Sequence, residues 1–300
     1  MKYNYNFESK FKLANLISFF LFFASLLLIF FKGLNYGIDF KGGTLIELRV
    51  DSKSTNISDV RFAFSNMNLG DLNVKEFGKK GDYLIKFEKK SYNQKDTLKK
   101  IKDNVSKKLG SDVNFRRIEN VGPKVSQELL NSGMLAIALS LGAMLFYIWV
   151  RFEWQFSLGS IVAIFHDVLI TIGLFSLLSL EINLSIVAAV LTIVGYSMND
   201  TVVIYDRIRE NLKKLSSLKI GEICNISINE TLSRTIITSL TTLLALISIF
   251  VLGGEILRGF AFAMIVGVLI GTYSSIFVAS PILRYLNVSF KTIEKEKEDI

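Results

Sequence analysis

Six long apolar stretches dominate this chain of 300 residues, half of which are hydrophobic. Each is long enough to cross a bilayer, which takes about 20 apolar residues in a helix. This pattern is typical of a membrane protein and predicts an α-helical polytopic membrane protein with six transmembrane helices. In chain order the predicted spans are Leu13–Phe31, Gly133–Val150, Phe156–Leu180, Ile182–Tyr205, Thr235–Leu252 and Phe260–Leu283.

The flanking charges predict how the spans are oriented. The first stretch is too long for the apolar part of a signal peptide and lacks a small-residue cleavage site, so we expect it to be retained. The most basic short connection is 206–233, and the positive-inside rule then places it and both termini in the cytoplasm. The expected organisation is a cytoplasmic N-terminus (1–12), transmembrane helix 1 (13–31), an extracytoplasmic domain (32–132), transmembrane helices 2–6 (133–283) and a cytoplasmic tail (284–300).

The segment between the first two spans alternates between strand and helix patterns. Alternating apolar residues predict strands, and apolar residues at helical spacing predict two helices between them. The order strand, helix, strand, strand, helix, strand predicts a small α+β domain with the ferredoxin-like arrangement. Its expected elements are Thr44–Val50, Ile57–Met67, Leu72–Phe77, Tyr83–Phe87, Gln94–Leu109 and Val113–Ile118.

Several kinds of site are excluded by composition. The single cysteine, Cys224, excludes an internal disulfide framework and a cysteine-rich metal site, and the single histidine, His166, excludes a multi-histidine site. The net charge of +8 lies mainly between the apolar stretches, where it orients a membrane protein, so no nucleic-acid partner is expected. Because the chain also lacks a phosphate-binding loop, neither a metal nor a cofactor is expected.

Asp200 is the strongest candidate functional residue, because it lies in the fourth apolar stretch. A charge at membrane depth costs roughly 3 kcal/mol or more, so such residues usually face a bundle interior or a water-filled path. The alternative is a carboxylate that only holds helices together. Helical spacing places Tyr196, Asn199, Asp200 and Arg207 on one face. Asp206 ranks second, because it lies nearer the predicted cytoplasmic edge and is expected to pair with a basic residue or reach water.

Two further polar groups occur in the third and fifth spans. Asp167 falls on a stripe of small or polar residues four apart, which predicts that it faces protein rather than lipid. Its neighbour His166 fits a proton relay and a simple interhelical hydrogen bond equally well. Arg234 stands at the start of the fifth span, where it could pair with Asp200 or serve only as a positive-inside anchor.

The sixth span carries a small residue at every fourth position. Such a ridge predicts close helix packing, and it could also serve as a sliding surface in a moving transporter. The residues of the ridge are Gly259, Ala263, Gly267, Gly271, Ser275 and Ala279.

Two short motifs flank the α+β domain. The segment 36–44, YGIDFKGGT, contains Gly42 and Gly43, which permit a tight turn or a close backbone approach. The segment 121–130, VGPKVSQELL, begins with a helix-breaking Gly-Pro pair, and Val125–Leu130 is expected to form a short helix.

Together these motifs resemble the SecF proteins of the SecD/SecF protein-export family, within the resistance–nodulation–division superfamily of proton-driven transporters. The resemblance covers nearly the whole chain in order. The matching segments are GIDFKGGT (37–44), VGPKVSQEL (121–129), RFEWQFSLGSIVAIFHDVLIT (151–171), IVGYSMNDTVVIYDRIREN (193–211), TLSRTIITSLTTLLA (231–245) and GGEILRGFAFAMIVGVLIGTYSSIFVASPI (253–282).

The resemblance implies a subunit of the Sec machinery in the bacterial inner membrane that works with SecD and uses the proton or sodium gradient to promote export. It implies three kinds of partner besides lipid: SecD, the SecYEG channel and secreted preproteins. It assigns ion coupling to Asp200 and Arg234, and less strongly to Asn199, Asp167 and Asp206. His166 is kept among the candidate ion-coupling residues because it lies beside Asp167, and not because of the resemblance. No catalysis is implied.

Three other interpretations remain open. A small-molecule efflux transporter would share the membrane carboxylates, although such pumps usually carry two large outer domains. An intramembrane aspartyl protease could use Asp167 and Asp200 as a dyad. However, the sequence around Asp200 does not match the Gly-x-Gly-Asp pattern of those proteases. A structural scaffold for SecD or the translocon would need only the helix ridge.

Overall fold

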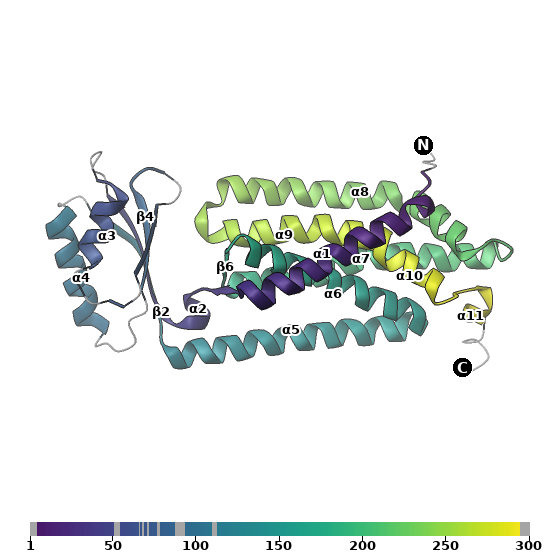
Figure 1. The fold of residues 1–300 in the computed structure, drawn as a ribbon, viewed down its shortest axis with the longest axis horizontal. Coiled ribbons are helices and arrows are strands. Elements are labelled where there is room, and N and C mark those ends of the chain that lie inside the picture. Colours follow the sequence, from purple (N-terminus) through teal and green to yellow (C-terminus); the bar gives the residue numbers. More distant parts are fainter. Residues whose placement is uncertain are drawn as a thin grey trace. The chain divides into compact units, whose positions relative to one another are not determined.

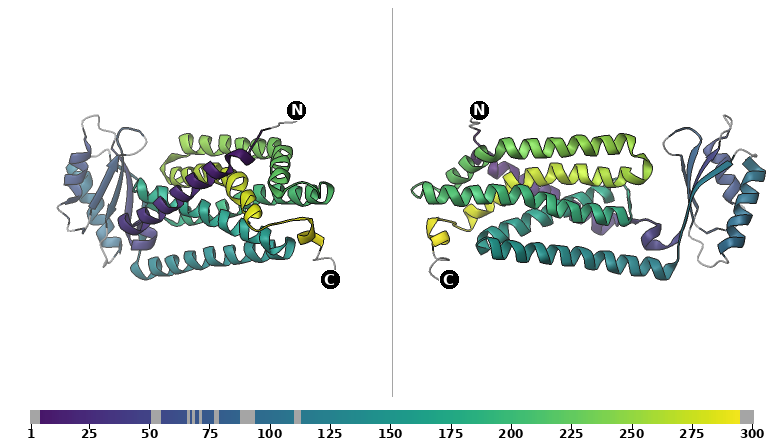
Figure 2. Two further views of the ribbon diagram at one scale, coloured as in Figure 1. Left: turned by 45° about the vertical axis from the view of Figure 1, so that its right-hand side comes forward. Right: turned by 180° about the vertical axis from the view of Figure 1, so that it is seen from behind.

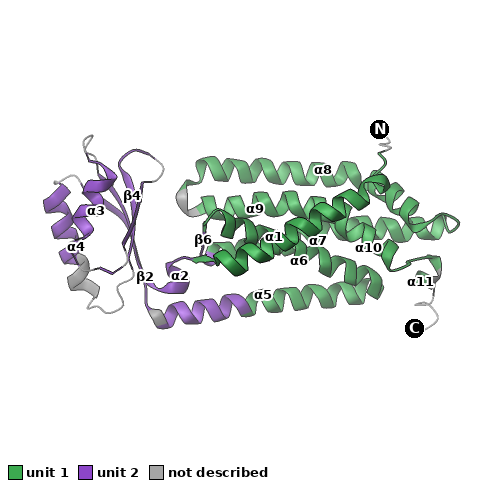
Figure 3. Ribbon diagram, in the orientation of Figure 1, with its two compact units in different colours: residues 1–35, 135–180, 185–300 green, residues 36–134, 181–184 purple. Residues whose placement is uncertain are grey.

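The computed structural model describes residues 5–50, 55–65, 67, 69–70, 72–76, 79–87, 94–109 and 113–294. The chain forms two compact units (Figure 3). The helical unit comprises residues 1–35, 135–180 and 185–300, and the sheet unit comprises residues 36–134 and 181–184.

Within the described residues, six helices are long and apolar enough to cross a membrane, as the sequence predicts. Figure 1 shows α8 and α9 as an antiparallel pair that packs side by side. The spanning helices are α1 (Phe11–Lys32), α5 (Pro123–Arg151), α6 (Trp154–Leu177), α7 (Leu184–Lys214), α8 (Ile220–Leu252), and α9 (Gly254–Ser274) with its continuation to Tyr285. A short 3-10 turn, Glu8–Lys10, precedes α1, and a short helix, α11 (Phe290–Glu294), follows the last span.

Two of the expected boundaries were wrong. The separate short helix expected at Val125–Leu130 is the first part of α5, which begins at Pro123, where a missing N–H is tolerated. The connection 206–233 is largely helical, because α7 continues to Lys214 and α8 begins at Ile220.

Three of the spanning helices form the interior of the helical unit. Of the most apolar segments of α6, α7 and the last span, 56%, 50% and 56% is buried, whereas in α1, α5 and α8 the buried share is 17%, 11% and 17%. Polar side chains on the three interior helices are therefore removed from lipid by protein. The central core contains Phe152, Phe156, Tyr205 and Leu283 among its fully buried members.

The last span contains a π-helical segment that the sequence does not predict. Residues Ser275–Ala279 form a single wider turn between α9 and α10 (Ser280–Tyr285). Pro281 lacks a backbone N–H, so the regular hydrogen-bond ladder is interrupted at this point. Side chains replace part of it: the Tyr205 hydroxyl donates to the Ala279 carbonyl at 2.9 Å, and Ser280 Oγ donates to the Ser275 carbonyl at 2.8 Å.

The sheet unit has the ferredoxin-like arrangement that the sequence predicts. Four antiparallel strands lie in the order β3-β4-β2-β5, with α3 (Ile57–Ser65) and α4 (Gln94–Leu109) on one face (Figure 2). The central strand β2 (Gly43–Val50) pairs Ile46 with Ile85 of β4 (Asp82–Phe87) and with Ile118 of β5 (Val113–Val121). The edge strand β3 (Leu72–Glu76) pairs with β4, and Phe77, expected to end it, lies outside the described residues.

The chain also forms a second, two-stranded sheet and one turn of helix. The strands are β1 (Asn35–Tyr36) and β6 (Glu181–Ile182), and the helix is α2 (Ile38–Lys41). Gly42 and Gly43 follow α2 with φ angles of 79° and 133°, which L side chains rarely adopt, so the expected tight turn is present.

Candidate functional site

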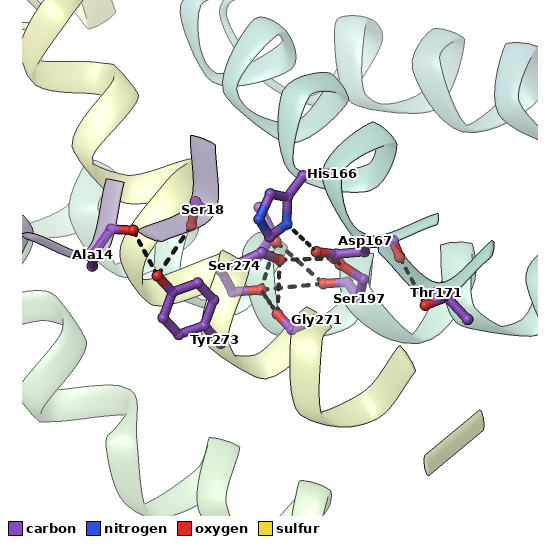
Figure 4. Close-up of polar contacts among 11 residues, drawn as sticks. Ala14, Ser18, His166, Asp167, Thr171, Ser197, Gly271, Tyr273 and Ser274 are labelled. Atoms are coloured by element: carbon purple, nitrogen blue, oxygen red, sulfur yellow. Dashed lines mark hydrogen bonds and ion pairs between the residues drawn. The ribbon is translucent and has the colours of Figure 1, made fainter. Parts of the chain in front are cut away.

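Asp167 lies at the centre of a fully buried polar cluster between α6, α7 and α9 (Figure 4). Its Oδ1 atom is 2.9 Å from Nδ1 of His166. Its Oδ2 atom accepts hydrogen bonds from Ser197 Oγ at 2.6 Å and Ser274 Oγ at 2.7 Å. Two hydroxyl donors and a histidine ring nitrogen thus surround one carboxylate, which offsets much of the cost of burying it.

The stripe of small or polar residues on α6 positions this carboxylate. Gly159, Ala163, Asp167 and Thr171 are all buried, which confirms that the stripe faces protein. A Cβ atom on Gly159 would clash with the Tyr205 hydroxyl, so glycine permits α7 to approach closely at this point. Thr171 Oγ1 donates to the backbone carbonyl of Asp167 at 2.8 Å and so needs no partner on another helix.

The Ser274 hydroxyl gives the cluster two hydrogen-bonding states. It lies 2.7 Å from Asp167 Oδ2 and 3.1 Å from the Gly271 carbonyl oxygen, but it has only one proton to donate. When it donates to the carboxylate, Asp167 is an acceptor. When it donates to Gly271, a protonated Asp167 can donate to Ser274 instead. The cluster therefore accommodates either protonation state of Asp167 without moving a heavy atom.

His166 extends the cluster toward α1. Its ring stacks on Tyr273, with 6.4 Å between centroids, and the Tyr273 hydroxyl donates to the Ala14 carbonyl at 2.8 Å while accepting from Ser18 Oγ at 3.0 Å. The Nε2 atom of His166 is buried and has no hydrogen-bond partner among the described residues. The histidine can thus hold Asp167 through one nitrogen and leave the other free for a proton.

Asp200 lies on the same helix as Ser197, and it is also buried, with a relative exposure of 2%. Asn199 Nδ2 donates to its Oδ1 atom at 3.4 Å, although Asn199 itself is exposed. The Oδ2 atom of Asp200 is buried and accepts no hydrogen bond of ordinary geometry from the described residues. The hydroxyls of Ser239 and Thr272, 2.7 Å from each other, lie beside this carboxyl group.

Arg234 is exposed on α8 and interacts with Asp200 through its charge. No hydrogen bond joins the two side chains in the described part of the chain, so the expected pairing is electrostatic at longer range. An exposed guanidinium on a spanning helix is costly in lipid. Its position therefore suits contact with another polar group outside this chain.

Asp206 lies apart from the other candidates. It forms an ion pair with Arg151 at the end of α5, with 3.1 Å between Nη2 and Oδ1. Arg209, three residues further along α7, pairs with the buried Glu153 at 2.9 Å, and its guanidinium stacks on Phe152. These contacts fasten the α5–α6 turn to α7, and they leave Asp206 partly exposed.

The ridge on the last span packs against α7. A Cβ atom on Gly267 would come within 2.3 Å of Ile193, one on Gly271 within 3.0 Å of Ser197, and one on Gly259 within 3.5 Å of Ile186. Ala263 and Ser275 are fully buried, and Ser275 Oγ lies 2.8 Å from Thr201 Oγ1. The ridge thus brings Ser197 and Ser274 to Asp167.

Ser197, Ser274 and Tyr273 are not among the residues predicted from the sequence. Ser274 directly precedes the recognised ridge residue Ser275, and Ser197 lies one turn before Asp200, but neither spacing identifies an acceptor on another helix. Within the described residues, no group of three or more histidine, cysteine, aspartate or glutamate side chains could hold a metal ion.

Two family models match the chain. "Protein export membrane protein SecD/SecF, C-terminal" matches residues 101–289, and "SecD/SecF GG Motif" matches residues 27–53. "Protein translocase subunit SecF" of Cereibacter sphaeroides is 44% identical over 279 residues, covering 90% of this chain and 86% of the relative. The protein of the same name from Vibrio alginolyticus is 43% identical over 278 residues, covering 92% of this chain and 88% of the relative.

Two solved structures of SecDF are also similar to this chain. The crystal structure of SecDF from Thermus thermophilus, described as a translocon-associated membrane protein, superposes with a TM-score of 0.83 at 37% identity. It covers 95% of this chain, which spans 39% of the SecDF chain. A second SecDF structure, in a super-membrane-facing form, gives a TM-score of 0.71 at 36% identity, and covers 100% of this chain and 40% of its own. With its six apolar helices, the protein is a multi-pass inner-membrane protein, and the chain belongs to the SecD/SecF family of protein-export membrane proteins.

Proposed function

We propose that this chain is the SecF-type subunit of the Sec protein-export machinery and couples an ion gradient to preprotein translocation. The observation that carries the proposal is the buried Asp200 on an interior helix. Its Oδ2 atom accepts no hydrogen bond from the described residues, and the chain belongs to this export family. A membrane carboxylate without a full set of donors is a poor structural element and a good ion acceptor.

SecD is the partner that best fits the exposed helix faces. The SecDF structures hold the matching region within one longer chain, of which this chain spans 39%. Arg234 is exposed on α8, with the half-exposed Thr238 one turn further along, so a polar group of the partner can meet the guanidinium there. The SecYEG channel and secreted preproteins are further partners in this proposal, and both termini lie in the cytoplasm.

The proposed cycle begins when an ion reaches Asp200. Protonation, or binding of sodium, neutralises the carboxylate and weakens its attraction to Arg234. The interior helices then repack, and Asp167 with His166 follows through the Ser274 hydroxyl, which can change its acceptor. Moving one charge through the membrane potential supplies roughly 2.3 kcal/mol per 100 mV, enough to bias a two-state movement.

Asp206 and Asn199 have smaller parts in this proposal. Asp206 already has a partner in Arg151 and lies six residues (206 − 200) beyond Asp200, about 9 Å along the helix. It would receive ions on the cytoplasmic side. Asn199 donates to Asp200 and would hold the carboxylate between transits.

The test is preprotein export in cells that carry Asp200→Asn. The matched control is Glu210→Gln, which neutralises an exposed carboxylate on the same helix. We expect Asp200→Asn to lose export and ion flux while the protein level and SecD co-purification stay normal, and Glu210→Gln to keep both activities. Normal export by Asp200→Asn would refute ion coupling at this residue and favour a scaffold role. Changed drug accumulation with normal export would favour an efflux transporter.

A further inference from the structure

The connection between α6 and α7 belongs to the sheet unit. Residues 181–184, including the first residue of α7, cluster with residues 36–134. Asp39 of α2 accepts a hydrogen bond from the backbone N–H of Leu184 through Oδ2 at 2.9 Å. The N–H of Gly37 donates to the Ile182 carbonyl at 2.8 Å. The motif around Asp39 therefore holds the start of the helix that carries Asp200.

This hydrogen bond has a specific chemical basis. The first four N–H groups of an α-helix have no partner inside the helix, and Leu184 is the first residue of α7. A carboxylate satisfies one of them and also interacts favourably with the positive end of the helix dipole. Asp39 is thus bound to α7 by charge as well as by a hydrogen bond, although the two residues are 145 positions apart.

The other side of Asp39 is fixed to the central strand of the sheet. The N–H of Gly42 donates to the Ile38 carbonyl at 2.9 Å and closes α2. Gly42 and Gly43, both at positive φ, then turn the chain directly into β2. The chain also approaches closely at Gly37, where a Cβ atom would come within 3.3 Å of Asn183 Cβ, a tighter contact than most side chains make.

A second contact, an ion pair, also joins the connection before α7 to the four-stranded sheet. Glu181 forms an ion pair with Lys86 of β4, the neighbour of β2. The start of α7 is therefore attached to two adjacent strands, once through a helix cap and once through a charge pair.

We propose that Asp39 is a positioning residue that transmits movement of α7 to the sheet of the sheet unit. This inference rests on the proposed function, because it assumes that ion binding at Asp200 moves α7. The helix runs 16 residues (200 − 184) from Asp39's partner to Asp200, about 24 Å, without a proline. A rigid helix shifts both of its ends together, so movement at Asp200 reaches Leu184. Asp39 and the Gly42–Gly43 turn then carry it into β2.

The experiment separates transmission from simple stabilisation. Asp39→Ala removes the acceptor, whereas Asp39→Asn and Asp39→Ser keep an oxygen that can cap the helix. The matched control is Asp59→Ala, which removes the carboxylate that accepts from the Asn56 N–H at the start of α3, away from the connection. Ion flux into membrane vesicles and preprotein export are measured for each full-length variant together with SecD.

We expect Asp39→Ala to reduce export roughly fivefold or more, the lower range of conformational coupling, while ion flux and SecD co-purification stay normal. Asp39→Asn, Asp39→Ser and Asp59→Ala should retain export. Equal loss of flux and export, loss of the complex, or no loss at all would each overturn the proposal, and so would an equal loss in Asp59→Ala. Failure of the proposed function gives a different pattern, because export would then survive Asp200→Asn.

Discussion

Adding one methyl group to Gly267 tests whether the helix ridge is tightly packed. Its Cβ would lie 2.3, 2.5 and 3.0 Å from Cγ1, Cδ1 and Cγ2 of Ile193, whereas carbon atoms normally approach to about 3.5–4.0 Å. Ile193 is itself buried and β-branched, so it has few alternative rotamers. Overpacking of this kind costs about 1–3 kcal/mol.

Gly195→Ala is the matched control, because an added Cβ at this position on α7 meets no atom within 4 Å. Both substitutions replace glycine by a better helix former, which contributes up to about 1 kcal/mol, so their difference isolates the clash. We expect the free energy of unfolding of Gly267→Ala to be about 1–3 kcal/mol lower than that of Gly195→Ala. The melting temperature should then be lower by roughly 2–12 °C, at 2–4 °C per kcal/mol.

The chain carries a convenient reporter for this measurement. Cys224 is its single cysteine and is buried, so reaction with a thiol-sensitive dye during heating follows unfolding of the solubilised protein. Ile193→Ala removes all three clashing atoms, so the double variant should be more stable than the sum of the single effects predicts. Equal melting temperatures for Gly267→Ala and Gly195→Ala, or strictly additive effects with Ile193→Ala, would refute the packing argument.

Three further substitutions probe other contacts. Arg209→Ala leaves the carboxylate of Glu153 buried without its cation, and we expect a loss of about 3–5 kcal/mol in thermal unfolding, partly restored by adding Glu153→Gln. Tyr205→Phe removes the donor to the Ala279 carbonyl and should cost about 1–3 kcal/mol in the same assay, whereas an unchanged melting temperature would mean that the π-helical turn does not need it. Burial raises the pKa of Tyr83 above its usual value, so the stability that its neutral hydroxyl contributes is complete below about pH 10 and is lost as the pH rises further. Tyr83→Phe removes this titration, so melting curves recorded at several pH values should show a smaller loss of stability above about pH 10.

The spans were predictable from the lengths of the apolar runs, but their ends were not. Hydropathy identifies only the apolar part of a helix, whereas α7 and α8 continue beyond their apolar parts. Ion pairs such as Arg207 with Glu230 stabilise these polar extensions, and their partners lie on two different helices. No local pattern in 206–233 distinguishes such a pair from two charged loop residues.

The candidate site was predictable only in part. Spacing alone placed Asp167 on a face directed toward protein, because small residues four apart permit close helix contact. Its partners Ser197 and Ser274 were not predictable, since serine and threonine in helices commonly bond to their own backbone, as Thr192 does to the Ala188 carbonyl. The distance from Arg234 to Asp200 likewise depends on how α8 packs against its neighbours.

The π-helical turn at Ser275–Ala279 makes the last span tolerant of a single-residue deletion at this point. A π turn holds one more residue than an α turn, so deleting Val278 would return the segment to regular helix without changing the faces of the residues that follow. In a helix that is regular throughout, by contrast, a one-residue deletion rotates everything that follows by about 100°, the angle of one residue in a 3.6-residue turn. When Val278 is deleted, Leu283, now completely buried, and Tyr285, now 68% exposed, would therefore keep their present faces. A single-residue deletion in this turn would thus be less damaging than one in a regular helix.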